Sequence, residues 1–308
     1  MIFFRRHRLA PYLLLLPSAA VIAALVLWPT VQIAEFSFQN YGLQQEIGAA
    51  PAQWVGLANY SHILHDPEFW LSLRLSVISA AVMVPLTLIV GTLVGLLLSR
   101  LGRKMAALVS SISVLAWATP AVSASVIFVW LATPDGGVVD WFLTKLPNWL
   151  GGGAHWAGFS WTNAALPAYT LATAVVVWLG FPFIAVSVLA GLRTIPTELL
   201  ESARVDGASR LTVLWRIVLP LAKPALATLT ALTLLDSWNN FLWPLIAVTS
   251  TSQMTLPLGL ATFQGAHETQ WTLLMAANVM SLLPMLVVFI VAQRFFIRSV
   301  AATGLAGT

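Results

Sequence analysis

Residues 197–220 read TELLESARVDGASRLTVLWRIVLP, a polar segment between two long apolar stretches. Thr197 is expected to cap a helix. Glu198 then falls in the first turn, where the positive end of the helix dipole favours a carboxylate. Gly207 is suited to end the helix. The segment therefore predicts a helix of about ten residues, roughly 15 Å long, whose apolar positions are Leu199, Leu200, Ala203 and Val205.

A second short helix is expected directly after the first. Ser209 is a favourable capping residue for it, and it should end near Pro220. The two helices would meet at a tight corner formed by Asp206 and Gly207. A short helix with small residues and an exposed carboxylate is able to dock into a groove on another protein. An ordinary amphipathic loop is the alternative interpretation.

The rest of the chain predicts an integral membrane protein. Of its 308 residues, 59% are hydrophobic and only 8% are charged, whereas an average soluble domain carries about 25% charged residues. A soluble globular enzyme is therefore excluded. A spanning helix needs about 20 apolar residues, and six stretches are long enough: 9–31, 69–98, 106–131, 164–192, 219–248 and 273–296. We expect an all-α membrane protein with six transmembrane helices.

The first apolar stretch has two interpretations. Arg5, Arg6 and Arg8 precede it, as basic residues precede the apolar part of a secretory signal. The run is about 23 residues long, however, and no clear small-residue cleavage pattern ends it. We therefore expect a retained membrane span.

The basic residues predict the orientation, because cytoplasmic loops of membrane proteins carry an excess of Lys and Arg. Most of them fall in four segments, and neighbouring segments are separated by two spans, so all four lie on the same side of the membrane. They are Arg5, Arg6, Arg8; Arg100, Arg103, Lys104; Arg193, Arg204, Arg210, Arg216, Lys223; and Arg294, Arg298. The opposite loops hold mainly acidic residues, namely Glu35, Glu46, Asp66, Glu68, Asp135, Asp140 and Glu268. Both termini are therefore predicted to be cytoplasmic.

Two long loops are predicted on the outer side, at about 32–68 and 132–163. Tryptophan prefers the membrane–water interface, so the second loop predicts a short interfacial segment. A docking surface for an external partner is the alternative. The tryptophans concerned are Trp141, Trp149, Trp156 and Trp161.

The sequence lacks the common signatures of a catalytic site. It contains no G-x-x-x-x-G-K-[ST], no H-E-x-x-H and no G-x-S-x-G, so it does not bind a nucleotide through a P-loop. It has no cysteine, which excludes disulfides, thiolate metal sites and cysteine nucleophiles. His62 and His65 are spaced for a shared metal, but no third ligand stands out nearby. We expect no catalytic residue, no bound metal and no enzyme activity.

The corner segment resembles a known motif. Glu201-Ser202-Ala203-x-x-Asp206-Gly207-Ala208, followed by Ile217-x-Leu219-Pro220, closely resembles the E-A-A-x-x-D-G-A … I-x-L-P pattern of the permease subunits of ATP-binding-cassette importers. Ser202 replaces the first alanine of the pattern. Further segments are similar to permeases of the carbohydrate-uptake type, which import sugars or glycerol phosphate with a binding protein: 11–17, 28–29, 55–60, 66–70, 238–244 and 255–260.

The resemblance implies a type I importer permease in the bacterial inner membrane. Residues 1–8 and 299–308 would be cytoplasmic tails, and 9–298 the six-span domain, with its coupling helix at about 195–220. Its partners would be a second permease subunit, two cytoplasmic ATPase subunits and an external solute-binding protein. ATP and Mg²⁺ would be bound by the ATPase subunits, and this chain would hold no cofactor. The residues implied in ATPase coupling are Glu201, Ser202, Ala203, Asp206, Gly207 and Ala208.

The resemblance also implies alternating access, in which Glu201 meets a basic group on the ATPase. The segments near the amino terminus are similar to one of the two permease subunits of this type, and those at 238–260 to the other. A heterodimer is expected, but which half of it this chain forms stays open, as does a homodimer.

Polar side chains interrupt the fifth apolar stretch. Asp236, Asn239, Asn240 and Trp243 follow the i, i+3, i+4, i+7 spacing of one helical face. Amides, a carboxylate and an indole suit a polyol, and Asn278 in the sixth stretch could join them. The alternative is that these groups only hold helices together, since Asn and Ser often hydrogen-bond between spans.

Other classes of function stay open. A secondary carrier driven by an ion gradient would need ionisable residues within the membrane, and Asp236 is the only acidic candidate. A lipid-processing enzyme would need a nucleophile with its base, or a metal set. A purely structural assembly subunit would show no dependence on a solute.

Overall fold

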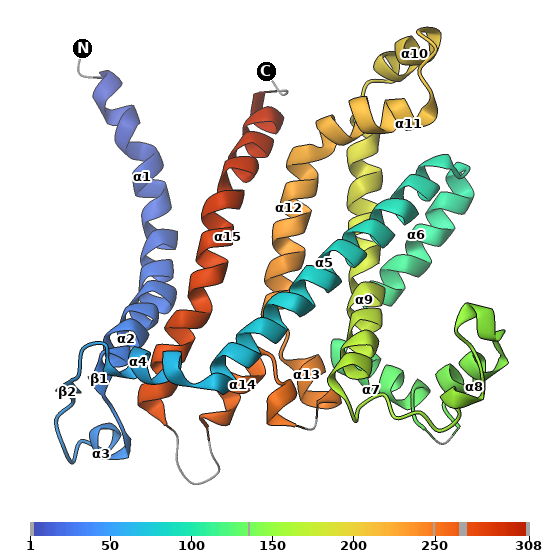
Figure 1. Cartoon of the computed structure of the whole chain (residues 1–308). Helices are drawn as coiled ribbons and strands as arrows, with labels where there is room; N and C mark the ends of the chain where they lie inside the picture. The colour runs from blue at the N-terminus through green and yellow to red at the C-terminus, as the bar shows by residue number, and fades with distance from the viewer. Residues whose placement is uncertain (1–2, 135, 249, 265–269, 306–308) are drawn as a thin grey trace. The chain divides into compact units, whose positions relative to one another are not determined.

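The computed structural model describes residues 3–134, 136–248, 250–264 and 270–305. The chain divides into two compact units, a first unit of Met1–Trp70 with Gly259–Pro284 and a second unit of Leu71–Leu258 with Met285–Thr308. Within the described residues, helices make up nearly all of the regular structure, which confirms the predicted fold class (Figure 1). Two residues counted above, Asp135 and Glu268, lie outside the described residues.

The first unit begins with one long helix, made of α1 (Phe3–Ile22), a π-helical turn (Ala23–Leu27) and α2 (Trp28–Ser37). It continues with β1 (Gln39–Asn40), α3 (Leu43–Glu46), β2 (Gln53–Trp54) and α4 (Ala58–His65), in which the two strands pair antiparallel. The first candidate membrane span, Tyr12–Ser37, has none of its most apolar window buried inside the chain. Lipid or another subunit must therefore cover it.

Asn59 and Tyr60 hold the loop after α2 in place. Asn59 Nδ2 donates to the carbonyl oxygens of Ser37 and Gln39, at 2.8 and 3.0 Å. The Tyr60 hydroxyl lies 2.6 Å from the Ser37 hydroxyl. These bonds tie the start of α4 to the end of α2, so the two residues have a structural role.

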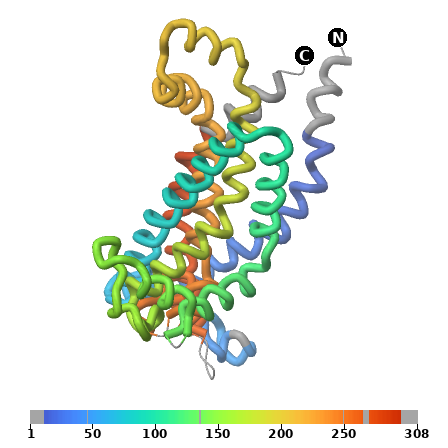
Figure 2. Tube along the Cα trace, turned by 90° about the vertical axis from the view of Figure 1, so that its right-hand side faces the viewer, coloured from blue at the N-terminus to red at the C-terminus, as the bar shows by residue number. Residues whose placement is uncertain are grey.

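The second unit contains most of the helices. In chain order they are α5 (Pro67–Arg100), α6 (Arg103–Trp117), α7 (Ala121–Leu131), α8 (Val138–Lys145), α9 (Ala165–Arg193), α10 (Thr197–Val205), α11 (Arg210–Val213), α12 (Leu219–Trp238), α13 (Leu242–Ala247) and α14 (Leu256–Thr262), before the end of α15 (Trp271–Leu305). The first residues of α5 and the last of α14 belong to the first unit, as does the first part of α15. Figure 2 shows α10 and α11 beyond the end of α9.

The main core of the second unit surrounds the first half of α9. Ala168, Leu171, Ala172 and Val175 of α9 are buried there with Met83, Trp161, Trp243 and Ala247. A smaller cluster of Leu98, Ala185 and Leu189 lies toward the other end of α9. α9 is therefore the central helix of this unit.

The third apolar stretch is bent. Five helices of the described chain are long and apolar enough to cross a membrane, and a sixth span requires α6 and α7 together, which are bent by 92°. The break falls at Pro120. Proline cannot donate the helical hydrogen bond, and it disfavours helical backbone in the residue before it. The apolar stretch at 106–131 therefore forms two helices.

Three glycines bring α5 and α9 into close contact. A methyl group built on Gly91 would lie 2.5 Å from Ile184 Cβ, and one on Gly95 would lie 2.8 Å from the Ala185 carbonyl oxygen. Across the same interface, one on Gly180 would lie 2.7 Å from Cγ2 of Thr87. The Gly91-x-x-x-Gly95 spacing is typical of membrane helices whose backbones approach closely.

We expect Gly91→Leu to separate α5 from α9 and to lower the stability of the protein by about 3 kcal/mol or more, because overpacking a tight contact forces the backbones apart. The thermal unfolding midpoint of the detergent-purified chain measures this. Gly191→Leu is the matched control, because a side chain at Gly191 of α9 meets open space. Equal midpoints for the two variants would contradict the prediction.

Candidate functional site

The predicted helix at the start of the corner segment is present as α10, which has nine residues. Glu198 lies in its first turn, as expected. The expectation that Thr197 caps the helix is wrong, because Thr197 is already the first helical residue and Pro196 occupies the cap position. The Pro196 carbonyl oxygen accepts the hydrogen bond of the Leu199 N–H, at 3.3 Å.

Gly207 ends α10 as predicted, and it does so in a left-handed conformation with φ +77°. The Ala208 N–H donates to the Ala203 carbonyl oxygen at 2.9 Å, and the Gly207 N–H donates to that of Arg204 at 3.0 Å. This pair of bonds is the Schellman motif, which satisfies the last carbonyl groups of a helix. The direction of the chain after Asp206 therefore depends on a residue that tolerates positive φ.

Ser209 caps α11 as predicted, since its hydroxyl accepts a hydrogen bond from the Thr212 N–H at 3.2 Å. The expectation that this second helix ends near Pro220 is wrong. α11 passes through a π-helical turn, Leu214–Val218, directly into α12. In this wider turn the Leu219 N–H bonds back to the Leu214 carbonyl. Pro220 is therefore the second residue of α12 and directly follows the π-helical turn.

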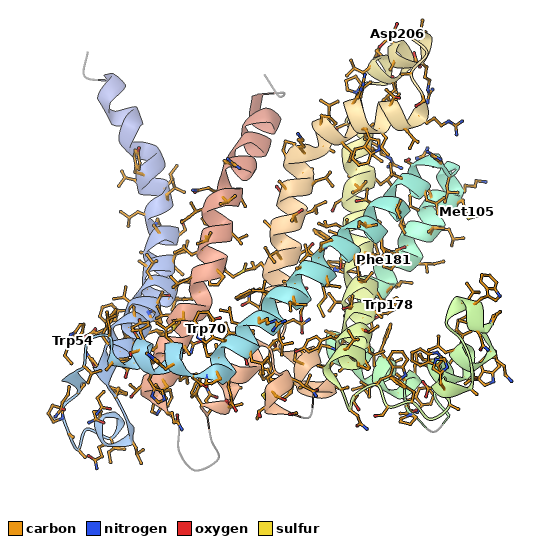
Figure 3. All side chains as sticks on the ribbon, in the orientation of Figure 1. Trp54, Trp70, Met105, Trp178, Phe181 and Asp206 are labelled. Carbon is orange, nitrogen blue, oxygen red and sulfur yellow. The ribbon has the colours of Figure 1, made fainter. Side chains whose placement is uncertain are left out.

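The surface of the corner is exposed, and its acidic groups have no partner among the residues that the structure describes. Glu201 and Asp206 are exposed, and neither carboxylate makes a hydrogen bond or an ion pair to the described part of the chain. Figure 3 shows Asp206 at the tip of the corner. Large apolar side chains are exposed beside them, namely Leu199, Val205, Leu211 and Trp215. Unpaired charges next to exposed apolar side chains are typical of a docking surface.

Of the remaining coupling candidates, Ala203 is buried and Ala208 is partly buried. The Ser202 hydroxyl donates to the Leu199 carbonyl oxygen at 3.2 Å, so it is satisfied within its own helix. A serine in place of alanine therefore adds no unpaired group to the surface.

The predicted polar face of the fifth span is interrupted in the structure. α12 ends at Trp238 and α13 begins at Leu242, so the prediction of one continuous helical face is wrong. Asn240 Oδ1 accepts the Trp243 N–H at 3.2 Å, and Asn239 Nδ2 donates to the Leu235 carbonyl oxygen at 2.9 Å. Asparagine side chains compete for backbone hydrogen bonds in this way and so favour helix ends.

The candidates for the solute pathway therefore have different surroundings. Asp236 and Asn239 are exposed within this chain, whereas Trp243 is buried in the core beside α9. Asn278 belongs to the first unit, where its amide donates to the Leu274 carbonyl oxygen at 2.9 Å.

Asp140 organises the loop at 132–163, a role that its sequence context did not indicate. The carboxylate is buried, accepting Trp161 Nε1–H at 2.7 Å and the Phe159 N–H at 3.0 Å. Trp156 stacks on Trp161 with ring centroids 5.5 Å apart. Two of the four loop tryptophans are therefore structural, while Trp141 and Trp149 are exposed and remain candidates for the membrane interface or a partner.

Known proteins are similar to this chain in sequence or in fold. The diacetylchitobiose uptake system permease protein DasB of Streptomyces coelicolor is 41% identical over 77% of this chain and 70% of its own length. The sulfoquinovosyl glycerol transport system permease protein SmoG of Agrobacterium fabrum is 32% identical over 74% and 72%.

A solved bacterial ABC transporter involved in the import of the acidic polysaccharide alginate has the same fold. Its TM-score is 0.75 at 19% sequence identity, over 96% of this chain and 98% of that one. Residues 84–302 match the family described as "Binding-protein-dependent transport system inner membrane component". This match covers most of the chain, and the chain therefore belongs to the family of binding-protein-dependent transport system inner membrane components.

Proposed function

We propose that this chain is the permease subunit of an ATP-driven importer for a saccharide or a glycerol-phosphate-type solute. The observation that carries the proposal is the corner of α10 and α11, an exposed docking element whose acidic groups have no partner in the described part of the chain. Such an element suits a separate energy-supplying subunit. The names of the relatives support the solute class, since DasB and SmoG are named for a disaccharide derivative and a glycosyl glycerol.

The proposed cycle is alternating access. A solute-binding protein delivers the solute to the outer loops, and two ATPase subunits receive the corners of two permease subunits, expected to be a heterodimer. Closure of the ATPase subunits moves α10, and with it the ends of α9 and α12 to which α10 and α11 connect. This chain performs no covalent chemistry in the cycle and contributes the pathway and the mechanical link.

Reconstitution tests the proposal. The chain is co-purified with its partners, placed in proteoliposomes and supplied with the binding protein, candidate saccharides and ATP. Uptake that requires ATP and the binding protein is the expected result. Uptake by the chain alone that an uncoupler collapses would replace the proposal with an ion-driven carrier, because only a secondary carrier draws on the ion gradient.

The break between α12 and α13 is the proposed contact for the solute. The indole N–H groups of Trp238 and Trp243 are buried there, with no acceptor among the described residues, and Asn239 and Asp236 are exposed nearby in sequence. Water or a hydroxyl-rich solute has the chemistry to satisfy such groups.

We expect Asn239→Ala combined with Asn240→Ala to weaken the apparent affinity for the solute about fivefold to 30-fold, since each neutral hydrogen bond contributes about 1 kcal/mol and the double variant removes one or two of them. Uptake measured against solute concentration gives the affinity. Asn240→Asp is the control for the α13 cap, because a carboxylate also accepts the Trp243 N–H. Unchanged affinity and rate in the double variant would show that these amides are structural.

A further inference from the structure

A groove lined by arginines lies beneath the corner, within the second unit. Its volume is about 880 Å³. Five arginines from five helices line it: Arg100 at the end of α5, Arg103 at the start of α6, Arg193 at the end of α9, Arg204 of α10 and Arg210 of α11. Residues more than 100 positions apart in the chain thus contribute to one concentration of positive charge.

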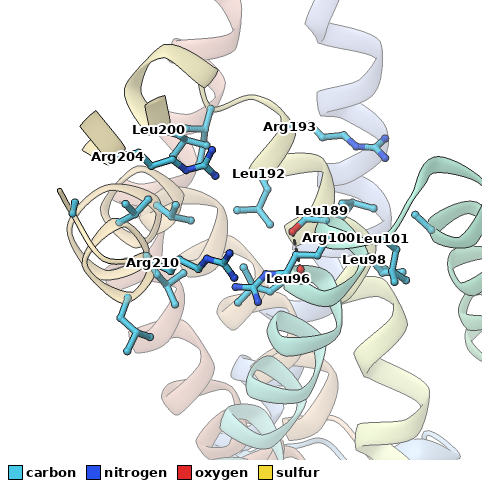
Figure 4. A pocket seen from close by; sticks show the side chains of 18 of the residues that line it. Leu96, Leu98, Arg100, Leu101, Leu189, Leu192, Arg193, Leu200, Arg204 and Arg210 are labelled. Carbon is cyan, nitrogen blue, oxygen red and sulfur yellow. Dashed lines mark hydrogen bonds between the residues drawn. The ribbon is translucent and has the colours of Figure 1, made fainter. Parts of the chain in front are cut away.

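The groove lacks a counter-charge of its own. No Asp or Glu lines it, and none of the five guanidinium groups makes an ion pair within the described part of the chain. In Figure 4 the side chains of Arg100 and Arg210 extend toward one another beside Leu192. Like charges converging without an acidic partner favour a bound anion. Guanidinium groups suit phosphate in particular, because they donate paired hydrogen bonds to its oxygens.

An uncharged crevice of about 230 Å³ continues from this groove between α9 and α12. The two share Leu96, Leu192, Ile195, Leu214 and Val218. Farther from the arginines the crevice is lined by small and apolar residues such as Val188, Ala222, Ala225 and Leu229. The combined shape is a cationic mouth that leads into an apolar slot along two membrane helices.

We propose that this groove binds an anionic phospholipid, with its headgroup phosphate among the arginines and an acyl chain in the crevice. Arg100 and Arg193 end long apolar helices, which places them at the depth of the headgroups. Basic pockets between membrane helices bind anionic headgroups in general. A soluble anion would use the arginines but would leave the apolar slot unoccupied.

The position of the groove gives the lipid a role. It touches the end of α5, the end of α9, α10 and α11, so a bound lipid bridges the corner to the membrane helices. The lipid would hold the corner in place when no ATPase subunit pulls on it. This inference does not depend on which solute is transported.

Native mass spectrometry of the purified transporter tests the proposal. The complex is equilibrated in nanodiscs of phosphatidylcholine with phosphatidylglycerol, released, and weighed with its retained lipids, without solute or ATP. We expect the wild type to retain phosphatidylglycerol selectively. Arg100→Gln with Arg210→Gln should reduce that retention about tenfold or more, because each basic residue near an anionic headgroup adds about fivefold to its binding.

Two further variants distinguish specific binding in the groove from a general effect of charge and from general annular lipid. Arg216→Gln removes one positive charge from the same segment but outside the groove, and it should retain phosphatidylglycerol normally. Ala225→Phe fills the crevice and leaves every arginine in place, and it should lose the lipid. Equal retention by all variants would overturn the proposal, since the lipid would then be general annular lipid.

Soluble glycerol phosphate provides the remaining arm of the test. If it displaces the retained lipid at millimolar concentration, the arginines recognise a free anion and the proposal is overturned. If it does not, the acyl chain contributes to binding, as proposed. Because the measurement uses no transport, a negative result leaves the proposed function intact, and a failure of ATP-driven uptake leaves the lipid result intact.

Discussion

Glu201→Lys is expected to reduce ATP-driven uptake by about 100-fold or more while the chain still inserts into the membrane. Glu201 is exposed on α10 and unpaired within the described chain, so its change leaves the folded permease without a new buried charge. If the carboxylate meets a basic group in the cleft of an ATPase subunit, a lysine there places two positive charges together. Such a juxtaposition costs several kcal/mol, and about 2.7 kcal/mol already corresponds to 100-fold.

The measurement is the amount of ATPase subunit that co-purifies with the tagged chain, together with uptake. Glu201→Gln is the graded control, because it keeps the shape and removes only the charge, and it should fall between the wild type and the lysine variant. Restored uptake after a basic-to-acidic change on the ATPase would identify the partner residue. Normal co-purification and uptake in the lysine variant would refute a coupling role for Glu201.

Gly207→Val should also reduce uptake strongly, by about tenfold to 100-fold. A side chain at Gly207 meets nothing within 4 Å, so crowding is not the cause. The backbone has φ +77°, and the left-handed conformation costs an ordinary residue about 1–2 kcal/mol and a β-branched one more. The Schellman bonds would loosen, and Asp206 would leave the position that the corner gives it.

Gly102→Val is the matched control, since Gly102 also meets open space but has φ −61°, which any residue adopts. It should transport at nearly the wild-type rate. Gly207→Asn should be milder than Gly207→Val, because asparagine tolerates positive φ. The same loss of uptake in Gly102→Val and Gly207→Val would attribute the effect to added bulk near the docking surface and contradict the role of the turn.

The corner was predictable because its signals are local. The carboxylate in the first turn, the glycine stop and the Ser209 cap each act within a few residues, and all three occur where expected. The errors at Thr197 and Pro220 are of one or a few residues at helix ends. At the start of α10, the Pro196 carbonyl oxygen takes the hydrogen bond that the Thr197 side chain was expected to accept. Before Pro220, a π-helical turn continues the helix where an end was expected.

The parts that the sequence did not indicate depend on contacts between distant residues. Hydropathy identifies 106–131 as one apolar stretch, but it does not predict the 92° bend near Pro120. The shared-face prediction for Asp236 and Asn240 assumed an unbroken helix, and the backbone hydrogen bond to Asn240 Oδ1 starts a new one instead. In the sequence, Asp140 served only as one of the acidic residues that predict the outer side. Its structural role was not predictable, because its partners Phe159 and Trp161 follow about 20 residues later.

A movement of α10 can reach the membrane helices by two routes that differ in stiffness. The route through α9 and α5 is stiff because of the glycine contacts, and the route through α11 to α12 is more flexible because of the π-helical turn. The helices pack closely at Gly91 and Gly95, so we expect α5 and α9 to move together when α10 is displaced. The route through α11 instead crosses five π-helical residues, whose wider turn is less regular than an α-helix. We therefore expect a displacement of the corner to move α5 and α9 by its full amount and α12 by less. One movement of the ATPase subunits would then shift these helices by different distances.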